Sequence, residues 1–385
     1  MNKGKIYEER LSRIIKAANV EEPDRVPIIS TAQSFSVGYA GSTLHACMAD
    51  EQEEYRVYDK TYTDFYWDGA IRYGTVRNMD FYGILGYNTY FESKEGTVLE
   101  HLDKTFMNDS DYPEFLKDPM SYLINVELAR KYPSLSKTYP ENKEALLNAA
   151  QNLLEYAART ERRMLHAKDD LELPVLENGV FLMPGIDFLF SYLRGFKGLA
   201  DMRRRPDDVL KACQMITDIM LYPYVASQGE SKDSFAFAPA LFTPYLAREQ
   251  FEKIVWPDYK KLIEEYHRLG GRTFLMMEGK WGHVYDLLID LPKGSVVAHV
   301  EKDDIFDLKK KVGSKVCVAG GIDIYDLRYS SKQECIDKVK RVIDECAPGG
   351  GYMFAPNQTL ITKEDVNPDN LRAVNEFVKE YGVYK

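Results

Sequence analysis

The chain has 385 residues, of which 45% are hydrophobic and 12% aromatic, enough for a large buried core. Its formal net charge of -10 at pH 7 argues against nucleic-acid binding, because a phosphate backbone attracts clustered basic surface. No apolar run approaches the ~20 residues of a membrane span, and the charged, amphipathic start lacks the apolar stretch of a signal peptide. We therefore expect a cytoplasmic protein with no membrane contact, and the five scattered cysteines fit a reducing compartment.

The first half of the chain predicts one short strand and a helical elaboration. Residues 3–20 carry apolar side chains at helical spacing, and RVPII at 25–29 then enters a strand. From about residue 43 to 166 the pattern is mostly helical and contains no clean linker. We expect one domain over 1–385, with 1–166 as the strand plus helical elaboration and 170–385 as the main repeats.

After residue 170, short apolar strands alternate with helical segments. Strands are predicted at LPVLENGVFLM (173–183), SFAFAPALF (234–242), TFLMMEG (273–279), SVVAHVE (295–301), KVCVAGGID (315–323) and GGGYMFAPNQ (349–358). Helices are predicted over 184–228, over 243–269, from the end of the third strand to Ile289, and after the fourth and fifth strands. Such alternation is typical of a parallel sheet covered on both faces. No GxGxxG follows the first strand. With RVPII, the pattern predicts an α/β fold, a (β/α)8 barrel rather than an open doubly wound sheet.

Four successive predicted strands end in polar residues, namely Glu278, Glu301, Asp323 and Asn357. Active sites of this fold lie where the strands end. His299 shares a strand face with Glu301, because alternate residues point the same way. We predict Glu278 and His299 as catalytic residues.

Substrate contacts are predicted from the same rim. Trp281 and Tyr352 lie close to it in sequence, and with Asp323 and Asn357 they form the predicted substrate-binding set. Each residue also has a structural interpretation: Glu301 could cap the following helix, and His299 could be a hydrogen-bonded core histidine.

Four stretches of the chain are similar to a known family. They read YEERLSRIIKAANVEEPDRVPI (7–28), LFTPYLAREQFEKIVWPDYKKLI (241–263), KVCVAGGIDIYDLRYSSKQECIDKVKRVIDECAPGGGYMFAP (315–356) and NLRAVNEFVKEYGVY (370–384). They resemble the uroporphyrinogen decarboxylase superfamily, which implies a distorted (β/α)8 barrel with its site in the barrel mouth. That superfamily holds both porphyrinogen decarboxylases and corrinoid-linked methyltransferases, so membership alone does not decide the chemistry.

Two departures from family patterns argue against particular chemistries of the superfamily. Uroporphyrinogen decarboxylases carry an arginine motif after the first strand, whereas residues 30–43 here contain no arginine or lysine. A tetrapyrrole with many carboxylates needs such cationic clamps. The thiol-methylating members bind zinc through an HxC pair and a later cysteine, which would fall at Met276, Glu278 and near Asn357 or Gln358. All three ligands are missing.

With both of these family patterns missing, the chain resembles the substrate-side methyltransferases of corrinoid-dependent O-demethylases. The resemblance implies a corrinoid (cobalamin) carried by a partner protein and a small methylated substrate, often a methoxylated aromatic. The leaving oxygen of an ether needs a proton or a Lewis acid as its bond to carbon breaks. Glu278 could donate that proton, or Glu278, His299 and Glu301 could hold a Zn²⁺ ion. The sequence leaves both routes open.

Two other classes of function also stay open, as does a homodimer. One is a decarboxylase or lyase of a smaller carboxylic acid, which an arginine in the barrel mouth would favour. The other is a non-catalytic module that docks a corrinoid protein, which a mouth filled by packed side chains would favour.

The histidines predict that the chain has no tightly bound corrinoid of its own. Corrinoid proteins of these systems usually carry a DxHxxG sequence for cobalt ligation, and none of the six histidines here lies in one. We expect the purified protein to be colourless. A red-brown absorbance at one equivalent of cobalamin would contradict this prediction.

Overall fold

Eight parallel strands form the centre of the protein. The computed structural model describes residues 4–75, 77–87 and 89–385. The strands are β1 (Ile29–Ser30), β2 (Gly69–Ala70), β5 (Glu177–Phe181), β6 (Phe235–Pro239), β7 (Arg272–Met277), β8 (Val296–Val300), β9 (Cys317–Ile322) and β10 (Tyr352–Pro356). Strands β5 to β10 form one sheet in chain order, and β1 pairs with β2. Parallel bridges Ala70–Val175 and Ile28–Phe354 join the two sheets, so the strands close into a ring. The predicted (β/α)8 barrel is confirmed.

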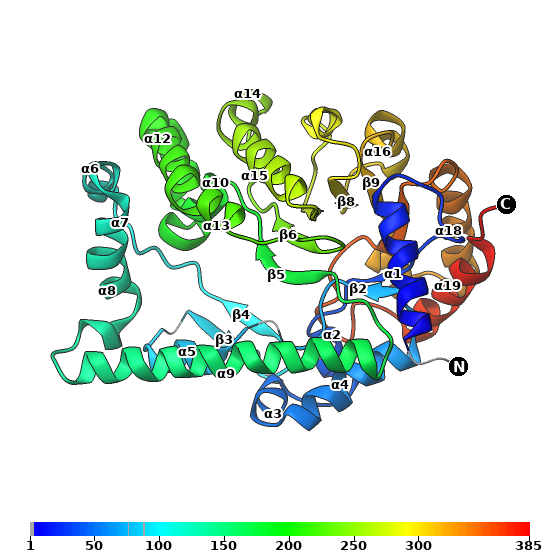
Figure 1. The fold of residues 1–385 in the computed structure, drawn as a ribbon, viewed down its shortest axis with the longest axis horizontal. Coiled ribbons are helices and arrows are strands. Elements are labelled where there is room, and N and C mark those ends of the chain that lie inside the picture. The colour runs from blue at the N-terminus through cyan, green and yellow to red at the C-terminus, as the bar shows by residue number, and fades with distance from the viewer. Residues whose placement is uncertain (1–3, 76, 88) are drawn as a thin grey trace.

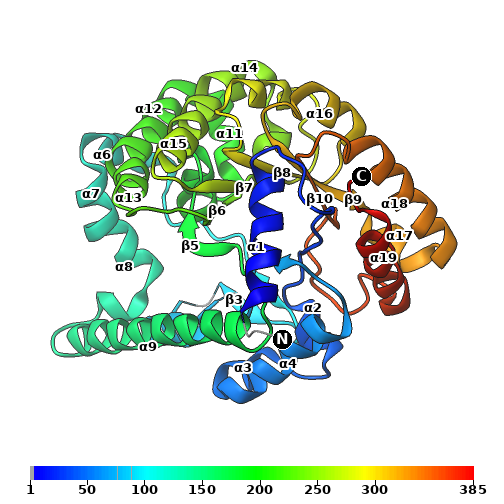
Figure 2. The same cartoon turned by 45° about the vertical axis from the view of Figure 1, so that its right-hand side comes forward.

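Helices surround this barrel as an outer arc (Figures 1 and 2). The arc contains α10 (Gly185–Phe188), α11 (Lys197–Arg204), α12 (Pro206–Ile216), α13 (Tyr222–Ala226), α14 (Arg248–Gln250), α15 (Trp256–Arg268), α16 (Ile305–Val312), α17 (Ile324–Tyr329), α18 (Lys332–Cys346) and α19 (Pro368–Tyr381). Successive side chains of a strand point alternately to the helices and to the barrel interior, and both faces are apolar because both are buried. In β7, Leu275 and Met277 pack with helical side chains, whereas Phe274 and Met276 belong to the barrel interior.

Helix α1 (Lys5–Ala18) covers the end of the barrel where the strands begin. Its buried residues Ile14 and Ala17 pack with Phe235 and Phe274, which face inward near the starts of β6 and β7. Figure 2 shows α1 crossing in front of the strands. The predicted helix is therefore present, although its predicted start at residue 3 lies outside the described residues.

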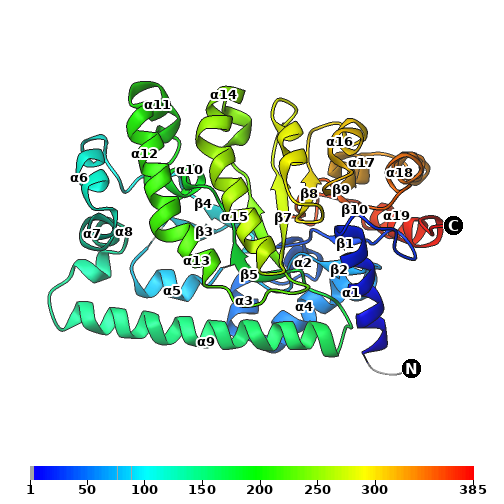
Figure 3. The same cartoon turned by 45° about the horizontal axis from the view of Figure 1, so that its top comes forward.

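Three helices lie between β1 and β2, namely α2 (Phe35–Tyr39), α3 (Leu44–Ala49) and α4 (Glu51–Asp64). A long excursion then lies between β2 and β5. It contains α5 (Met79–Ile84), the antiparallel hairpin β3 (Tyr90–Glu92) and β4 (Leu99–His101), α6 (Tyr112–Lys117), α7 (Pro119–Tyr122), α8 (Leu128–Lys131) and α9 (Glu141–Asp169). Helix α9 has 29 residues, about 43 Å at 1.5 Å per residue. Figures 1 and 3 show it along one side of the molecule, beside α5. In the described residues no helix is long and apolar enough to cross a membrane.

The structure corrects two predicted helices. The segment from Glu278 to Ile289 is a turn followed by a 3-10 helix at Tyr285–Asp290, because Gly279 has a φ of 72°, which a helix does not accommodate. The segment 184–228 is divided among α10 to α13, with breaks at Gly195 (φ 58°) and before Pro206. Hairpin β3–β4 was not predicted.

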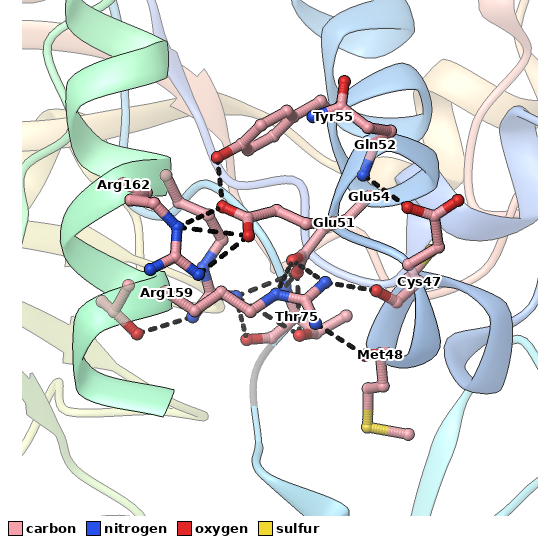
Figure 4. A network of polar contacts seen from close by, with 12 residues as sticks. Cys47, Met48, Glu51, Gln52, Glu54, Tyr55, Thr75, Arg159 and Arg162 are labelled. Atoms are coloured by element: carbon pink, nitrogen blue, oxygen red, sulfur yellow. Dashed lines mark hydrogen bonds and ion pairs between the residues drawn. The ribbon is translucent and has the colours of Figure 1, made fainter. Parts of the chain in front are cut away.

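A buried ion-pair network fixes the excursion against α4 (Figure 4). The fully buried Glu54 carboxylate accepts hydrogen bonds from Arg159 at 2.6 Å and Arg163 at 2.9 Å, both on α9. The same carboxylate accepts the backbone N–H of Thr75 at 2.8 Å. Glu54 therefore joins α4, α9 and the loop that precedes α5.

Replacing Glu54 by glutamine should strongly destabilise the fold. Removing one partner of a buried ion pair leaves uncompensated charge and typically costs ~3–5 kcal/mol. The matched control is Glu53→Gln, because Glu53 pairs with the exposed Arg56, and an exposed pair contributes less than ~1 kcal/mol. Urea unfolding midpoints measure both changes. Equal midpoints for the two variants would contradict the prediction.

Candidate active site

A cavity of about 1150 Å³ opens at the ends of the barrel strands. Phe237 and Met276 reach it from the barrel interior, and Glu278 reaches it just beyond β7. The excursion supplies the facing wall, including Arg77 and Tyr82. Phenylalanine and tyrosine are the most frequent residue types among the lining residues. The site is therefore an aromatic chamber built by two distant parts of the chain.

Glu278 is the carboxyl group that the barrel presents to this cavity. It continues the inward-facing series Phe274 and Met276, so the pleat of β7 directs it into the mouth. Burial and the nearby Glu301 charge raise the pKa of Glu278 to about 7. Across the described residues no hydrogen-bond donor meets its carboxylate. Glu278 is thus about half protonated at pH 7, and no donor among the described residues stabilises its ionised form.

Glu301 lies beside Glu278 but is already engaged. Its carboxylate accepts the backbone N–H of Gly279 at 2.6 Å and the Gln358 side-chain N–H at 2.5 Å. These bonds fix the turn that carries Glu278. Glu301 therefore acts on the position and the pKa of Glu278.

Asp187 is a second carboxyl group near the site that the sequence analysis missed. It lies on α10, just after β5, and is buried. Burial raises the pKa of Asp187 to about 8, and the Glu278 charge adds to the shift. Tyr259 donates a hydrogen bond to it at 3.3 Å. Asp187 follows a strand, as Glu278 does, so the same pattern could have identified it had 184–228 not been read as one helix.

His299 lies in the barrel interior beside Phe274 and does not line the cavity. Its Nε2 lies 2.8 Å from the carbonyl oxygen of Pro356, so this nitrogen carries the proton and donates it. Burial lowers the pKa of His299 to about 4, so the ring is neutral near pH 7. It pairs in register with Met276, one layer below Glu278. This placement fits a hydrogen-bonded core histidine.

The donor set does not fit the zinc ion considered for Glu278, His299 and Glu301. The described residues contain no group of three His, Cys, Asp or Glu side chains able to hold a metal ion. His299 Nε2 carries a proton, and both Glu301 oxygens accept hydrogen bonds. We therefore derive no step through a metal at these residues.

The four predicted substrate-binding residues do not line the cavity. Trp281 is buried in the helix-facing core, and Tyr352 is buried with its hydroxyl donating to the Gly320 carbonyl at 2.8 Å. Asn357 accepts the Gly321 N–H at 2.7 Å, and Asp323 caps α17. Each of these four residues therefore has a local structural role.

An eight-stranded parallel barrel with a cavity at its strand ends has the architecture of a (β/α)8 enzyme. Residues 188–381 match the family model for uroporphyrinogen decarboxylase (URO-D). The chain belongs to this family, whose members are largely enzymes with a barrel fold. A comparison with curated proteins gives no match.

The raised pKa of Glu278 predicts a pH-dependent effect on stability. A folded pKa near 7, above the ordinary value of 4.5, means that folding favours the protonated form. This contribution is complete below about pH 4.5 and is lost as the pH rises through 7. Glu278→Gln should therefore stabilise the protein at pH 8, by about 1–3 kcal/mol relative to its effect at pH 4.

Urea unfolding at the two pH values tests this expectation. Glu264→Gln is the control, because Glu264 lies on the outer face of α15 and pairs weakly with Lys260 at 3.9 Å. It should change stability by less than ~0.5 kcal/mol at either pH. A Glu278→Gln effect that is the same at pH 4 and pH 8 would show an ordinary pKa for Glu278.

Proposed function

We propose that the protein is a corrinoid-dependent methyltransferase that demethylates a methoxylated aromatic compound. The observation that carries the proposal is Glu278, a carboxyl group at the mouth of an aromatic cavity with a pKa near 7 and no hydrogen-bond donor among the described residues. Family membership supports the coarser statement, because the superfamily includes methyltransferases of this kind. The substrate, the corrinoid partner and the reaction are proposed here.

The cavity is suited to an aromatic substrate and a second reactant. Side chains such as Phe188, Tyr192, Phe237 and Phe242 offer faces and edges for ring packing. Small-molecule pockets usually measure about 300–1000 Å³. A cavity of about 1150 Å³ leaves space for a corrinoid to approach a bound single-ring ligand.

Glu278 assists the breaking of the ether bond in this proposal. The reduced corrinoid of a partner protein supplies the Co(I) nucleophile that takes the methyl group. As the methyl–oxygen bond breaks, its electron pair stays on the oxygen, and Glu278 transfers its proton there. A phenol and the Glu278 carboxylate result, and a proton from solvent restores the acid. We assign no step to His299, because its Nε2 proton is held by Pro356.

Asp187 stays protonated in this scheme while Glu278 gives up its proton. Two neighbouring carboxyl groups resist ionising together, and the Asp187 pKa of about 8 lies above that of Glu278. Asp187 is therefore mostly neutral near pH 7 and adds little negative charge while Glu278 ionises.

A decarboxylase or lyase acting on a smaller acid is the second candidate. Residues 30–43 carry no cation, but Arg72 and Arg77 line the cavity from the excursion. An arginine in the mouth is the observation that favours this class. Two arginines, one of them paired with Glu177, are few for a tetrapyrrole with many carboxylates. A non-catalytic docking module has less support, because the barrel mouth contains a cavity and is not filled by packed side chains.

The activity test uses free cob(I)alamin as methyl acceptor and a panel of methoxybenzenes and methoxybenzoates as donors. We expect loss of the Co(I) absorbance with at least one donor and release of the corresponding phenol. Glu278→Gln keeps the side-chain shape but has no proton to give, so the rate should fall by ~10²–10⁴. The wild-type rate should also decline as the pH rises through about 7, where Glu278 ionises.

Glu264→Gln again serves as control and should react as the wild type does. Near-wild-type turnover by Glu278→Gln would make Glu278 a structural carboxylate. Release of CO₂ from a carboxylic-acid donor without cobalt methylation would establish the decarboxylase instead.

A further inference from the structure

Arg77 is a cation on the cavity wall that meets no carboxylate partner in the part of the chain that the structure describes. It lies between β2 and α5, is half-buried, and lines the cavity. Over the described residues, which include every Asp and Glu of the chain, no carboxylate lies within ion-pair distance of its guanidinium. Arg72, on the same wall, pairs with Glu177. Arg77 therefore differs from its neighbour in keeping its charge uncompensated.

The surroundings of Arg77 are aromatic. Its guanidinium lies over the Tyr90 ring, 4.4 Å from the centroid, and donates a long hydrogen bond of 3.4 Å to the Tyr82 hydroxyl. The charge also acts on Tyr192 across the cavity wall. A guanidinium has five N–H donors, and these contacts use few of them. Stacking on Tyr90 orients the planar group while most of its donors stay available.

The segment that carries Arg77 is firmly attached. Thr75, two residues earlier, donates both its backbone N–H and its hydroxyl to the buried Glu54, at 2.8 and 2.9 Å. Arg163 covers Gly74, where a Cβ would lie 2.6 Å from its Nη1. The ion-pair network of Figure 4 thus holds the base of this segment. A site for a charged ligand is more selective when its cation is held in place.

We infer that Arg77 is the anion-binding residue of the cavity and takes a carboxylate carried by the substrate. Leaving a half-buried charge unpaired costs free energy, and a planar carboxylate offers the two oxygens that match the guanidinium fork. Together with the aromatic walls, this assigns the ligand as an aromatic carboxylic acid. The methoxy group on that acid rests on the proposed function; the carboxylate contact does not.

Calorimetric titration with 4-methoxybenzoate and 4-methoxybenzamide tests this inference by binding alone, with no methyl acceptor present. The two compounds have nearly the same shape and differ in charge. We expect the wild type to bind the acid at least about 10-fold more tightly than the amide, since a desolvated charge pair is worth this much. Arg77→Met should reduce acid binding to the level of the amide and leave amide binding unchanged. Arg77→Lys keeps the charge without the fork and should fall between.

The control is Arg203→Met, which removes an exposed positive charge on α11 that makes no ion pair in the described residues. It should bind the acid as the wild type does, whereas general loss of charge would weaken both variants alike. Equal binding of acid and amide by the wild type, no binding of either, or unchanged acid binding by Arg77→Met would overturn the inference. If Arg77→Met does not fold, by circular dichroism, Arg77→Lys decides: acid binding equal to that of the wild type overturns it.

The binding and activity measurements together distinguish the anion site at Arg77 from the proposed methyl transfer. Arg77-dependent acid binding with no methyl transfer would leave the anion site standing and end the proposed function. Methyl transfer that proceeds equally from acid and amide donors and is unaffected in Arg77→Met would do the reverse.

Discussion

The closure of the barrel depends on one buried carboxylate, Asp68. It directly precedes β2, is fully buried, and accepts hydrogen bonds from Arg13 of α1 and from Arg25, both at 2.7 Å. It also accepts the Ile28 N–H at 2.9 Å, beside β1. Strands β1 and β2 have two residues each, too few to hold a register by their own ladder. Asp68 replaces that missing ladder by joining both short strands to the helix that covers the barrel.

This closure determines which parts of the chain can face one another. Because β2 sits between β1 and β5, the excursion that follows β2 begins at the same rim as the ends of β7 and β8. Glu54 then holds the excursion in place through α9. As a result, Arg77 and Glu278, separated by two hundred residues of chain, line one cavity. A change at Asp68 or Glu54 would therefore act on the site as well as on the fold.

The sequence predicted the barrel because strands β5 to β10 are long enough to show alternation with helices. Strand β2 has no such pattern, and it is recognisable only from its bridges to Val175 and its pairing with β1. Glu278 was predicted because it ends one of four successive strands that finish in polar residues, where active sites of this fold lie. Trp281 and Tyr352 were assigned to the rim from their distance in sequence, which does not say where a side chain points. Arg77 has no periodic signal, because its position depends on the tertiary contact between Thr75, two residues earlier, and Glu54.

Glu278 and Arg77 have one electrostatic property in common, because neither group is compensated by the protein residues described around it. Among the described residues Glu278 meets no hydrogen-bond donor, and burial raises its pKa to about 7; Arg77 meets no carboxylate there, and its guanidinium stays charged. Each is costly to the fold when the cavity is empty, as strained or under-compensated groups in active sites often are. A ligand with an anionic group and an oxygen that needs a proton would satisfy both. The two residues impose different demands on it, since Arg77 selects the charge that binds and Glu278 acts only when a bond to oxygen breaks.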